Sequence, residues 1–239
     1  MNKGAILKLG SGILAAVCLC RLFPYGKAEI RQMKIKRELR ELQTEGSWQK
    51  DQEPTGCPEL AGILEYERLH MREEIVRGTD DQYYLDHLCD GTYSEKGTLF
   101  FAAGSRKEDM NRVLFGHHVY LENSRMTPLF SLLEETVEEA DLHFVINDGE
   151  GVTYYRMLAV LEVDYSQENV FNYLKSEYSD GELAEYNRHL KEDCVSCFFR
   201  EVKEGDRLLT MMTCRDEEGP VRILFIAAEE KKDILNEDI

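Results

Sequence analysis

Cys214 and Arg222 stand at the two facing ends of a predicted hairpin near the end of the chain. Cys214 closes an apolar run at residues 207–214 (RLLTMMTC), and Arg222 opens the next run at residues 221–228 (VRILFIAA). The residues between them are acidic and include Gly219 followed by proline, which suits an exposed turn. In an antiparallel pair the end of one strand lies beside the start of the next. The sequence therefore predicts that a thiol and a guanidinium share one edge of a sheet.

A thiol in this position needs a neighbour to act as a nucleophile, because a free thiol with a pKa of about 8.5 is mostly protonated near neutrality. His117 is the best candidate, since it follows Gly116 in RVLFGHHVY, where a strand gives way to a predicted loop and glycine permits a turn. His118 is its nearest competitor. The pattern predicts a nucleophile in Cys214, an acid and base in His117, and a stabiliser of negative charge in Arg222. The other histidines occupy helical, polar or strand contexts: His70, His87, His143 and His189.

Each of these residues also has an ordinary interpretation when it is taken alone. A free cysteine is commonly a small buried hydrophobe, a Gly-His pair is commonly a solvated turn, and a lone arginine is commonly a surface or salt-bridging residue. Arg215 is a competitor of Arg222, but it lies in the predicted loop, where nothing fixes its direction. It is the joint placement of the three residues that favours catalysis.

The remaining cysteines give little support to a metal or redox centre. The chain has seven cysteines, so at least one is unpaired. Cys194 and Cys197 have CxxC spacing, but no second pair and no histidine pattern accompany them, which argues against zinc. We predict no metal and no cofactor, and the sequence leaves open whether Cys194 and Cys197 pair.

Short runs rich in β-branched and aromatic residues predict the elements that position these side chains. Turn residues separate them, and helical patterns intervene at about residues 127–140 and 168–191. Together, these strands and helices predict a mainly β fold, a closed barrel with inserted helices. The predicted strands are residues 97–102, 112–120, 142–147, 153–163, 207–214 and 221–228.

The N-terminal part predicts a membrane anchor followed by a catalytic domain. Residues 9–20 (LGSGILAAVCLC) are uncharged and largely apolar, and flanking lysine and arginine can extend this short stretch by snorkelling. A cleaved signal peptide, a buried helix and a lipid-modified Cys18 are the alternatives. We divide the chain into a signal anchor at residues 1–25, a basic juxtamembrane helix and linker at residues 26–50, and a catalytic domain at residues 51–239.

Charge separates the two parts of the chain. The chain carries −17 overall, yet residues 1–40 hold nine Lys and Arg against two Asp and Glu, so they carry +7 and the remainder −24. A domain with this much negative charge repels phosphate backbones, and we therefore predict no nucleic-acid partner. More basic residues follow the anchor than precede it, which by the positive-inside rule favours a cytoplasmic domain.

From about residue 55 to residue 230 the chain resembles class B sortases, a family of cysteine transpeptidases. The family has a strand-borne TLxTC motif, an upstream Gly-His, and an arginine on the strand after the cysteine. Here these positions read TMMTC at residues 210–214, FGH at residues 115–117, and Arg222. A second resembling stretch, YYL…H…G-x-YS…G-x-x-F in the family, covers residues 81–87 (DQYYLDH), 91–94 (GTYS) and 97–100 (GTLF).

This chain departs from the family pattern at three places. Met211 replaces the usual leucine, a change that conserves volume. His118 stands where class B members usually have asparagine, and Gly62–Ile63 replaces the usual Gly-Trp of the first barrel strand. None of these departures touches the three predicted catalytic residues.

The resemblance implies a reaction that cuts a sorting signal, commonly of an NPxTN-like type, in a secreted protein. The new carboxyl end would pass through a thioacyl intermediate to an amine of peptidoglycan or of a pilin-like surface protein. Thr213 is expected to contact the substrate, and the helix-bearing insertion at about residues 166–197 to line the substrate groove or only to stabilise the barrel. The resemblance also implies an external domain anchored in the membrane of a Gram-positive bacterium, against the charge pattern.

Two other functions remain open from the sequence. A thiol hydrolase or protease would use the same cysteine and histidine with water as acceptor. A non-enzymatic surface module would keep the scaffold and not need Cys214.

Overall fold

The computed structural model describes residues 56–119, 122–134, 136–168, 170–216 and 219–230. The predicted anchor (residues 1–25) and the predicted basic helix and linker (residues 26–50) lie outside these residues. Within the described part of the chain, no helix has the length and apolar character that a membrane crossing requires.

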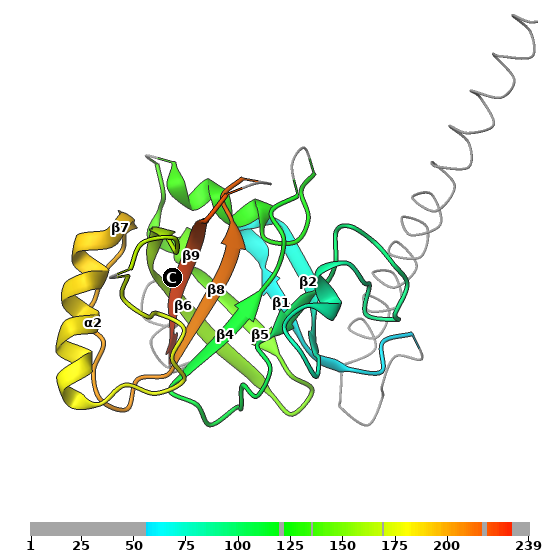
Figure 1. Cartoon of the computed structure of the whole chain (residues 1–239), viewed down its shortest axis with the longest axis horizontal. Coiled ribbons are helices and arrows are strands. Elements are labelled where there is room, and N and C mark those ends of the chain that lie inside the picture. Colours follow the sequence, from blue (N-terminus) through cyan, green and yellow to red (C-terminus); the bar gives the residue numbers. More distant parts are fainter. Residues whose placement is uncertain (1–55, 120–121, 135, 169, 217–218, 231–239) are drawn as a thin grey trace, which may run out of the picture.

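A closed β-barrel forms the centre of the molecule (Figure 1). The sheet order is β5-β1-β2-β3-β4-β8-β9-β6-β7, and pairing of β5 with β6 closes the barrel, so β7 is an additional strand at the edge of β6. The strands are β1 (Leu60–Tyr66), β2 (Met71–Arg77), β3 (Leu99–Phe101), β4 (Asn111–Phe115), β5 (His143–Asn147), β6 (Val152–Asp164), β7 (Cys194–Cys197), β8 (Leu208–Cys214) and β9 (Val221–Glu230).

The predicted mainly β barrel is confirmed, and all six strands predicted from composition are present as β3, β4, β5, β6, β8 and β9. Composition missed β1, β2 and β7. β2 reads MREEIVR, and two adjacent glutamates are atypical of a buried strand. Both Glu73 and Glu74 are nonetheless buried, because Arg125 is buried against them and supplies the opposite charge. A partner about fifty residues away therefore overrides the local preference.

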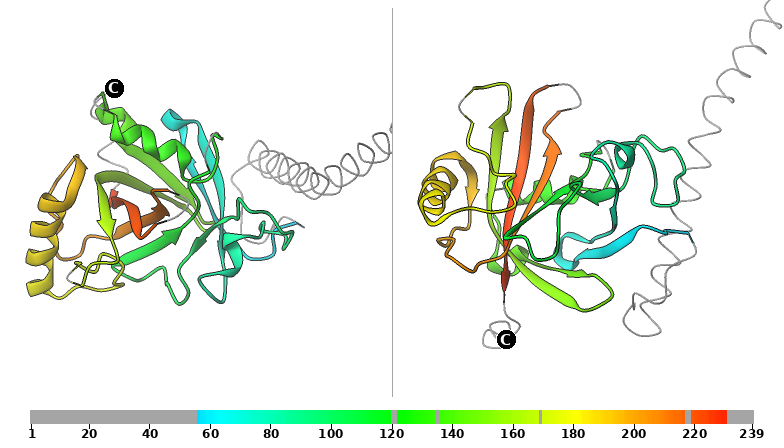
Figure 2. Two further views of the ribbon diagram at one scale, coloured as in Figure 1. Left: turned by 45° about the horizontal axis from the view of Figure 1, so that its top comes forward. Right: turned by 60° about the horizontal axis from the view of Figure 1, so that its bottom comes forward.

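Apolar side chains from every part of the sheet fill the barrel interior. The interior side chains include Leu64, Ile75, Leu99, Leu114, Met157, Met211 and Phe225. Where we expected a helix over residues 127–140, the chain forms two 3₁₀ helices, η3 (Thr127–Leu133) and η4 (Glu139–Leu142). Helix η3 contributes Leu129 and Leu132 to the interior cluster and lies across the end of the barrel where β8 ends (Figures 1 and 2).

Helix α2 (Asp180–Asp193) lies against the outside of the barrel beside β7 (Figure 1). It buries Leu183, Tyr186 and Leu190, spaced as one helix face, against residues of β6 and β9. The predicted helix over residues 168–191 was therefore too long at its start. Residues before Ser179 are irregular because Tyr173 and Tyr178 pack into the same cluster without helical spacing.

Two disulfides cross-link the described part of the chain. Cys57–Cys89 joins the segment before β1 to the loop after β2, and both residues are essentially buried. Cys194–Cys197 closes a small ring within β7, which answers the question that the sequence left open. Cys214 is the only free cysteine among the described residues.

We expect the Cys57–Cys89 disulfide to contribute more stability than Cys194–Cys197. Its residues are 32 apart and those of Cys194–Cys197 are 3 apart, and a longer closed loop restricts the unfolded chain more. The chain-entropy relation gives about 3–4 kcal/mol for the former and about 2 kcal/mol for the latter. Urea unfolding of the two double-alanine variants measures both values, and equal losses would contradict the expectation.

A second expectation concerns pH and the start of α2. Glu182 accepts a hydrogen bond from the Ser179 backbone N–H (2.9 Å) and pairs with Lys175. Lys175 and, after it, the Ser179 N–H lower the pKa of Glu182 to about 2. A depressed pKa stabilises the fold above the unfolded-state value and ceases to do so as pH falls through the folded value. The stability difference between the wild type and Glu182→Gln should be full above about pH 4.5 and vanish towards pH 2.

The control is Glu185→Gln on the same helix, because the Glu185 side chain makes no hydrogen bond or ion pair with any described residue. Its urea midpoint should follow that of the wild type at every pH. A Glu182→Gln difference that persisted unchanged at pH 2 would exclude this role for Glu182.

Candidate active site

The pairing of β4, β8 and β9 decides on which face and at which end of the sheet the residues of the predicted site lie. Cys214 of β8 is the Cα partner of Arg222 of β9, and partners on adjacent strands point to the same face. β4 runs parallel to β8 with Phe115 opposite Met212, and Gly116 N still donates to Met212 O at 3.3 Å. Two residues beyond this pair, the two strands lead to His117 and Cys214.

The face they share is the outside of the barrel. Thr210 donates a hydrogen bond to Asn111 at 2.8 Å on this face, whereas Leu114 and Met211 point into the interior. Alternation along each strand then places Cys214 with Thr210, outside the barrel.

A backbone carbonyl fixes the ring of His117. His117 Nε2 lies 2.7 Å from the carbonyl oxygen of Leu85. A carbonyl can only accept a hydrogen bond, so Nε2 carries a proton and donates it. Nδ1 is therefore the nitrogen that can gain and lose a proton. Leu85 holds the imidazole in one tautomer, as the third group does in catalytic triads.

The two adjacent histidines serve different parts of the fold. His118 Nδ1 donates to the carbonyl of Arg215 (3.2 Å), and its ring stacks on Phe130 with centroids 3.8 Å apart. Phe130 in turn packs against the interior cluster. His118 is thus a packing residue at the end of the barrel, and this geometry favours His117 as the partner of Cys214.

Gly116 is required for a reason other than the one expected. We expected glycine here to permit a turn, but Gly116 does not have a left-handed φ. A Cβ at this position would collide with the side chain of Leu99 and press on that of Met126. Close packing between β4 and its surroundings, and not a turn, excludes larger residues.

The two candidate arginines differ in their partners. Arg215 forms an ion pair with Glu162. Arg222 Nη1 donates to the carbonyls of Gly219 (2.6 Å) and Val221 (3.1 Å), and no carboxylate among the described residues pairs with it. Burial raises the pKa of the neighbouring Tyr165 to about 12 against the opposing effect of Arg222, and a tyrosine hydroxyl is neutral near pH 7 in either case. Arg222 keeps an uncompensated charge at the level of Cys214.

Thr213 lies on the opposite side of β8 from Cys214. It is 3% exposed, pairs with Ile223, and its hydroxyl has no hydrogen-bond partner among the described residues. Its predicted contact with a substrate would have to be made by its backbone, and it stays a prediction.

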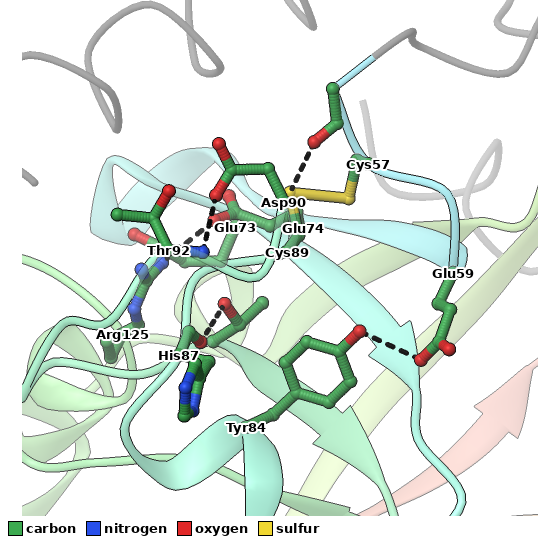
Figure 3. Close-up of a disulfide and its surroundings, with 12 residues drawn as sticks. Cys57, Glu59, Glu73, Glu74, Tyr84, His87, Cys89, Asp90, Thr92 and Arg125 are labelled. Atoms are coloured by element: carbon green, nitrogen blue, oxygen red, sulfur yellow. Dashed lines mark hydrogen bonds and ion pairs between the residues drawn. A yellow bond between two sulfur atoms is a disulfide. The ribbon is translucent and has the colours of Figure 1, made fainter.

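The loop between β2 and β3 positions the Leu85 carbonyl, and it is restrained at several points (Figure 3). The Cys57–Cys89 disulfide holds one part, and the Tyr84 hydroxyl donates to Glu59 at 2.8 Å. The hydroxyl of Thr98 donates to the His87 carbonyl, and Thr98 N donates to the Tyr84 carbonyl.

Gly97 completes these restraints. It has a φ of +57°, and a Cβ here would lie 2.5 Å from the Leu85 carbonyl oxygen and nearer still to that of Tyr84. Sequence reasoning missed these positioning roles, although Leu85 and Gly97 both lie within the second stretch that resembles class B sortases.

A buried arginine holds the segment that follows His117. Arg125 is 0% exposed and pairs with Glu73 and Glu74, as Figure 3 shows. Residues 118 and 125 form an isolated β-bridge, and Met126 N donates to the His117 carbonyl at 3.0 Å. The ion pairs therefore anchor the backbone on one side of His117, while the Leu85 carbonyl orients its ring.

The arrangement suits covalent catalysis by a thiol. It offers a half-buried free thiol, an imidazole with a fixed tautomer and an unpaired guanidinium. Among the described residues, no cluster of His, Cys, Asp or Glu has the geometry of a metal site.

A closed eight-stranded barrel with this order of strands defines the class of fold, and the comparisons identify it as that of class B sortases. A structure of sortase B complexed with triglycine matches with a TM-score of 0.75 and 17% identity, over 86% of this chain and 98% of that chain. The Staphylococcus aureus sortase B–substrate complex matches with a TM-score of 0.74 and 18% identity, over 86% and 98%.

A Streptococcus pyogenes class B sortase involved in pilus biogenesis matches with a TM-score of 0.63 and 20% identity, over 74% of this chain and 94% of that chain. No protein-family profile and no curated protein matches the sequence. The resemblance seen in the sequence is confirmed at the level of the fold.

We expect Gly97→Ala to displace the Leu85 carbonyl and release the ring of His117. Histidine ring ¹⁵N NMR should show Nε2 protonated in the wild type and a mixture of tautomers in the variant. A left-handed φ costs a non-glycine residue about 1–2 kcal/mol, and the clash should add to this.

Gly104→Ala is the matched control, because Gly104 also has a positive φ (+79°) but a Cβ there meets nothing within 4 Å. Its unfolding free energy should fall by the conformational cost alone, with the His117 tautomer unchanged. Identical effects of the two variants would show that Gly97 does not position Leu85.

Proposed function

We propose that this chain is a sortase-type cysteine transpeptidase, which cleaves a sorting signal in a secreted protein and joins the new carboxyl end to an amine. The observation that supports the proposal is strand register, which pairs Cys214 with Arg222 and ends β4, two residues before His117, beside Met212 of β8. The sortase B fold supports the class of reaction.

In the first step, the Cys214 thiolate attacks the scissile carbonyl carbon and a C–S bond forms. Arg222, whose charge no described carboxylate neutralises, stabilises the oxyanion. The C–N bond then breaks, and the proton on His117 Nδ1 passes to the leaving amine. In the second step the acceptor amine attacks the thioester, Nδ1 takes its proton, and the Cys214 thiolate leaves.

The acceptor and the donor protein are proposed from chemistry and likeness. An acidic catalytic domain tolerates a cationic amine, one similar structure holds triglycine, and the Streptococcus pyogenes protein is involved in pilus biogenesis. We propose an amine of peptidoglycan or of a pilin-like protein as acceptor. Helix α2 packs on the outside of the barrel. Whether it also lines a substrate groove stays a prediction.

We propose that residues 1–25 anchor the chain in the cell membrane and that the domain faces outwards. The two disulfides support this orientation, because disulfides persist in oxidising surroundings outside the cytoplasm. This argument outweighs the excess of basic residues after the anchor.

The decisive experiment is mass spectrometry of the protein after incubation with a panel of NPxTN-like peptides and triglycine. We expect an acyl adduct on Cys214 and a ligated peptide product. Cys214→Ala should abolish both, and His117→Ala should lower the rate by about 10²–10⁴-fold. Arg222→Lys should lower it by about 10²–10³-fold, because lysine lacks the forked donors.

Arg215→Lys is the control for Arg222→Lys, and it should leave the rate within about twofold. An adduct that yields only hydrolysed peptide, with triglycine present, would favour a thiol hydrolase. Wild-type behaviour of Cys214→Ala in cells would favour the non-enzymatic surface module.

A further inference from the structure

A polar cavity is lined by residues at the start of β8 and just before β4, among them Leu208 and Asp109. Figure 1 shows these strands beginning at the end of the barrel opposite the end of β8. The cavity has a volume of about 380 Å³ and is open to solvent. Leu208 lines it, and Cys214 ends the same strand six residues later, about 20 Å away at the usual rise of a strand. The cavity is therefore separate from the proposed catalytic site.

One buried charge of this cavity belongs to an arginine that forms no ion pair with a described carboxylate. Arg112 is 8% exposed, and its guanidinium carbon lies 3.8 Å from the centre of the Phe101 ring. Its Nε has no hydrogen-bond partner, and no described carboxylate forms an ion pair with it. Burial lowers the pKa of Arg112, although the Tyr155 hydroxyl, which accepts a hydrogen bond from it, and the charge of Asp148 act in the opposite direction. A buried charge costs stability unless an opposite charge or hydrogen bonds compensate it.

The other polar groups of the cavity surround this arginine with donors. The hydroxyls of Tyr155 and Thr153 line the wall, and Arg207 lies at the rim, where its Nη1 donates to the Lys107 carbonyl at 2.6 Å. Lys107 itself is already paired with Asp148 at 2.6 Å. Arg112 and Tyr155 are the buried donors of the cavity, whereas Arg207 is exposed.

The acidic groups of the cavity set limits on that ligand. Asp109 is occupied by the backbone N–H and the guanidinium of Arg106. Glu108 and Glu229 are exposed at the rim, where solvent screens their charges more than the protein screens Arg112. They disfavour a multiply charged anion, and a single carboxylate placed deep in the cavity avoids them.

We propose that this cavity binds a small organic carboxylate, whose oxygens accept hydrogen bonds from the Arg112 guanidinium and the Tyr155 hydroxyl. The planar guanidinium matches a carboxylate in shape and charge. The carboxylate would supply the ion pair that no described carboxylate forms with Arg112. The proposal does not depend on the transpeptidase function.

The test uses the full-length chain, titrated with acetate, lactate, citrate and inorganic phosphate at constant ionic strength. We expect saturable binding of the monocarboxylates in calorimetry, a melting temperature that rises with ligand concentration, and amide NMR shifts at residues 101, 112 and 155. Arg112→Met should weaken binding at least tenfold and still fold, because an apolar residue replaces an unpaired buried charge.

Three further variants make the outcome decisive. Arg188→Met removes an arginine of α2 that does not line the cavity and has a 53% exposed side chain, and it should leave affinity within about twofold. Tyr155→Phe should weaken binding and replaces Arg112→Met if that variant does not fold. Cys214→Ala should bind as the wild type does, even if the proposed reaction proves wrong. Saturable binding that Arg112→Met and Tyr155→Phe both retain, or no saturation by any monocarboxylate, would overturn the proposal.

Discussion

Five residues of β4 lie in register beside five residues of β8, and the proposed catalytic site depends on this parallel pairing. It pairs Phe115 with Met212, so that the chain reaches His117 on one side and Cys214 on the other two residues beyond this pair. The antiparallel pairing of β8 with β9 adds Arg222 on the same face. A shift of one residue in either pairing would turn one of the three side chains towards the barrel interior.

Register brings the catalytic groups together, but the loops around them decide how they point. The ring of His117 depends on a carbonyl in the loop between β2 and β3, and that loop depends on a disulfide, a glycine with positive φ and a tyrosine–glutamate hydrogen bond. On the other side of His117, the backbone depends on Arg125 and two buried glutamates. Removing one member of such a buried cluster is costly because it leaves the others without compensation. Rigid surroundings of this kind suit a site that needs a fixed tautomer.

The arginines at the two ends of the barrel differ in burial and in how their charges are compensated. Arg222 is partly exposed at the end where Cys214 lies, and its charge is available to a reacting group. Arg112 is buried at the opposite end beside a cavity, and its charge is available to a bound ligand. Arg125 is also buried, but carboxylates of its own chain compensate it. Among these three arginines, only Arg112 is both buried and without an ion pair to a described carboxylate.

The sequence by itself determined the barrel class, six of its strands and the hairpin that joins Cys214 to Arg222, because these depend on alternation and on neighbours close in the chain. It also favoured His117 over His118, and Arg222 over Arg215, through motifs. Only the tertiary structure decided that the Leu85 carbonyl fixes the His117 ring, that Arg125 allows two glutamates into a strand, and that Cys57 pairs with Cys89. These contacts join residues about thirty to fifty positions apart. Local composition carries no information about such partners, since each is chosen by the packing of the whole barrel.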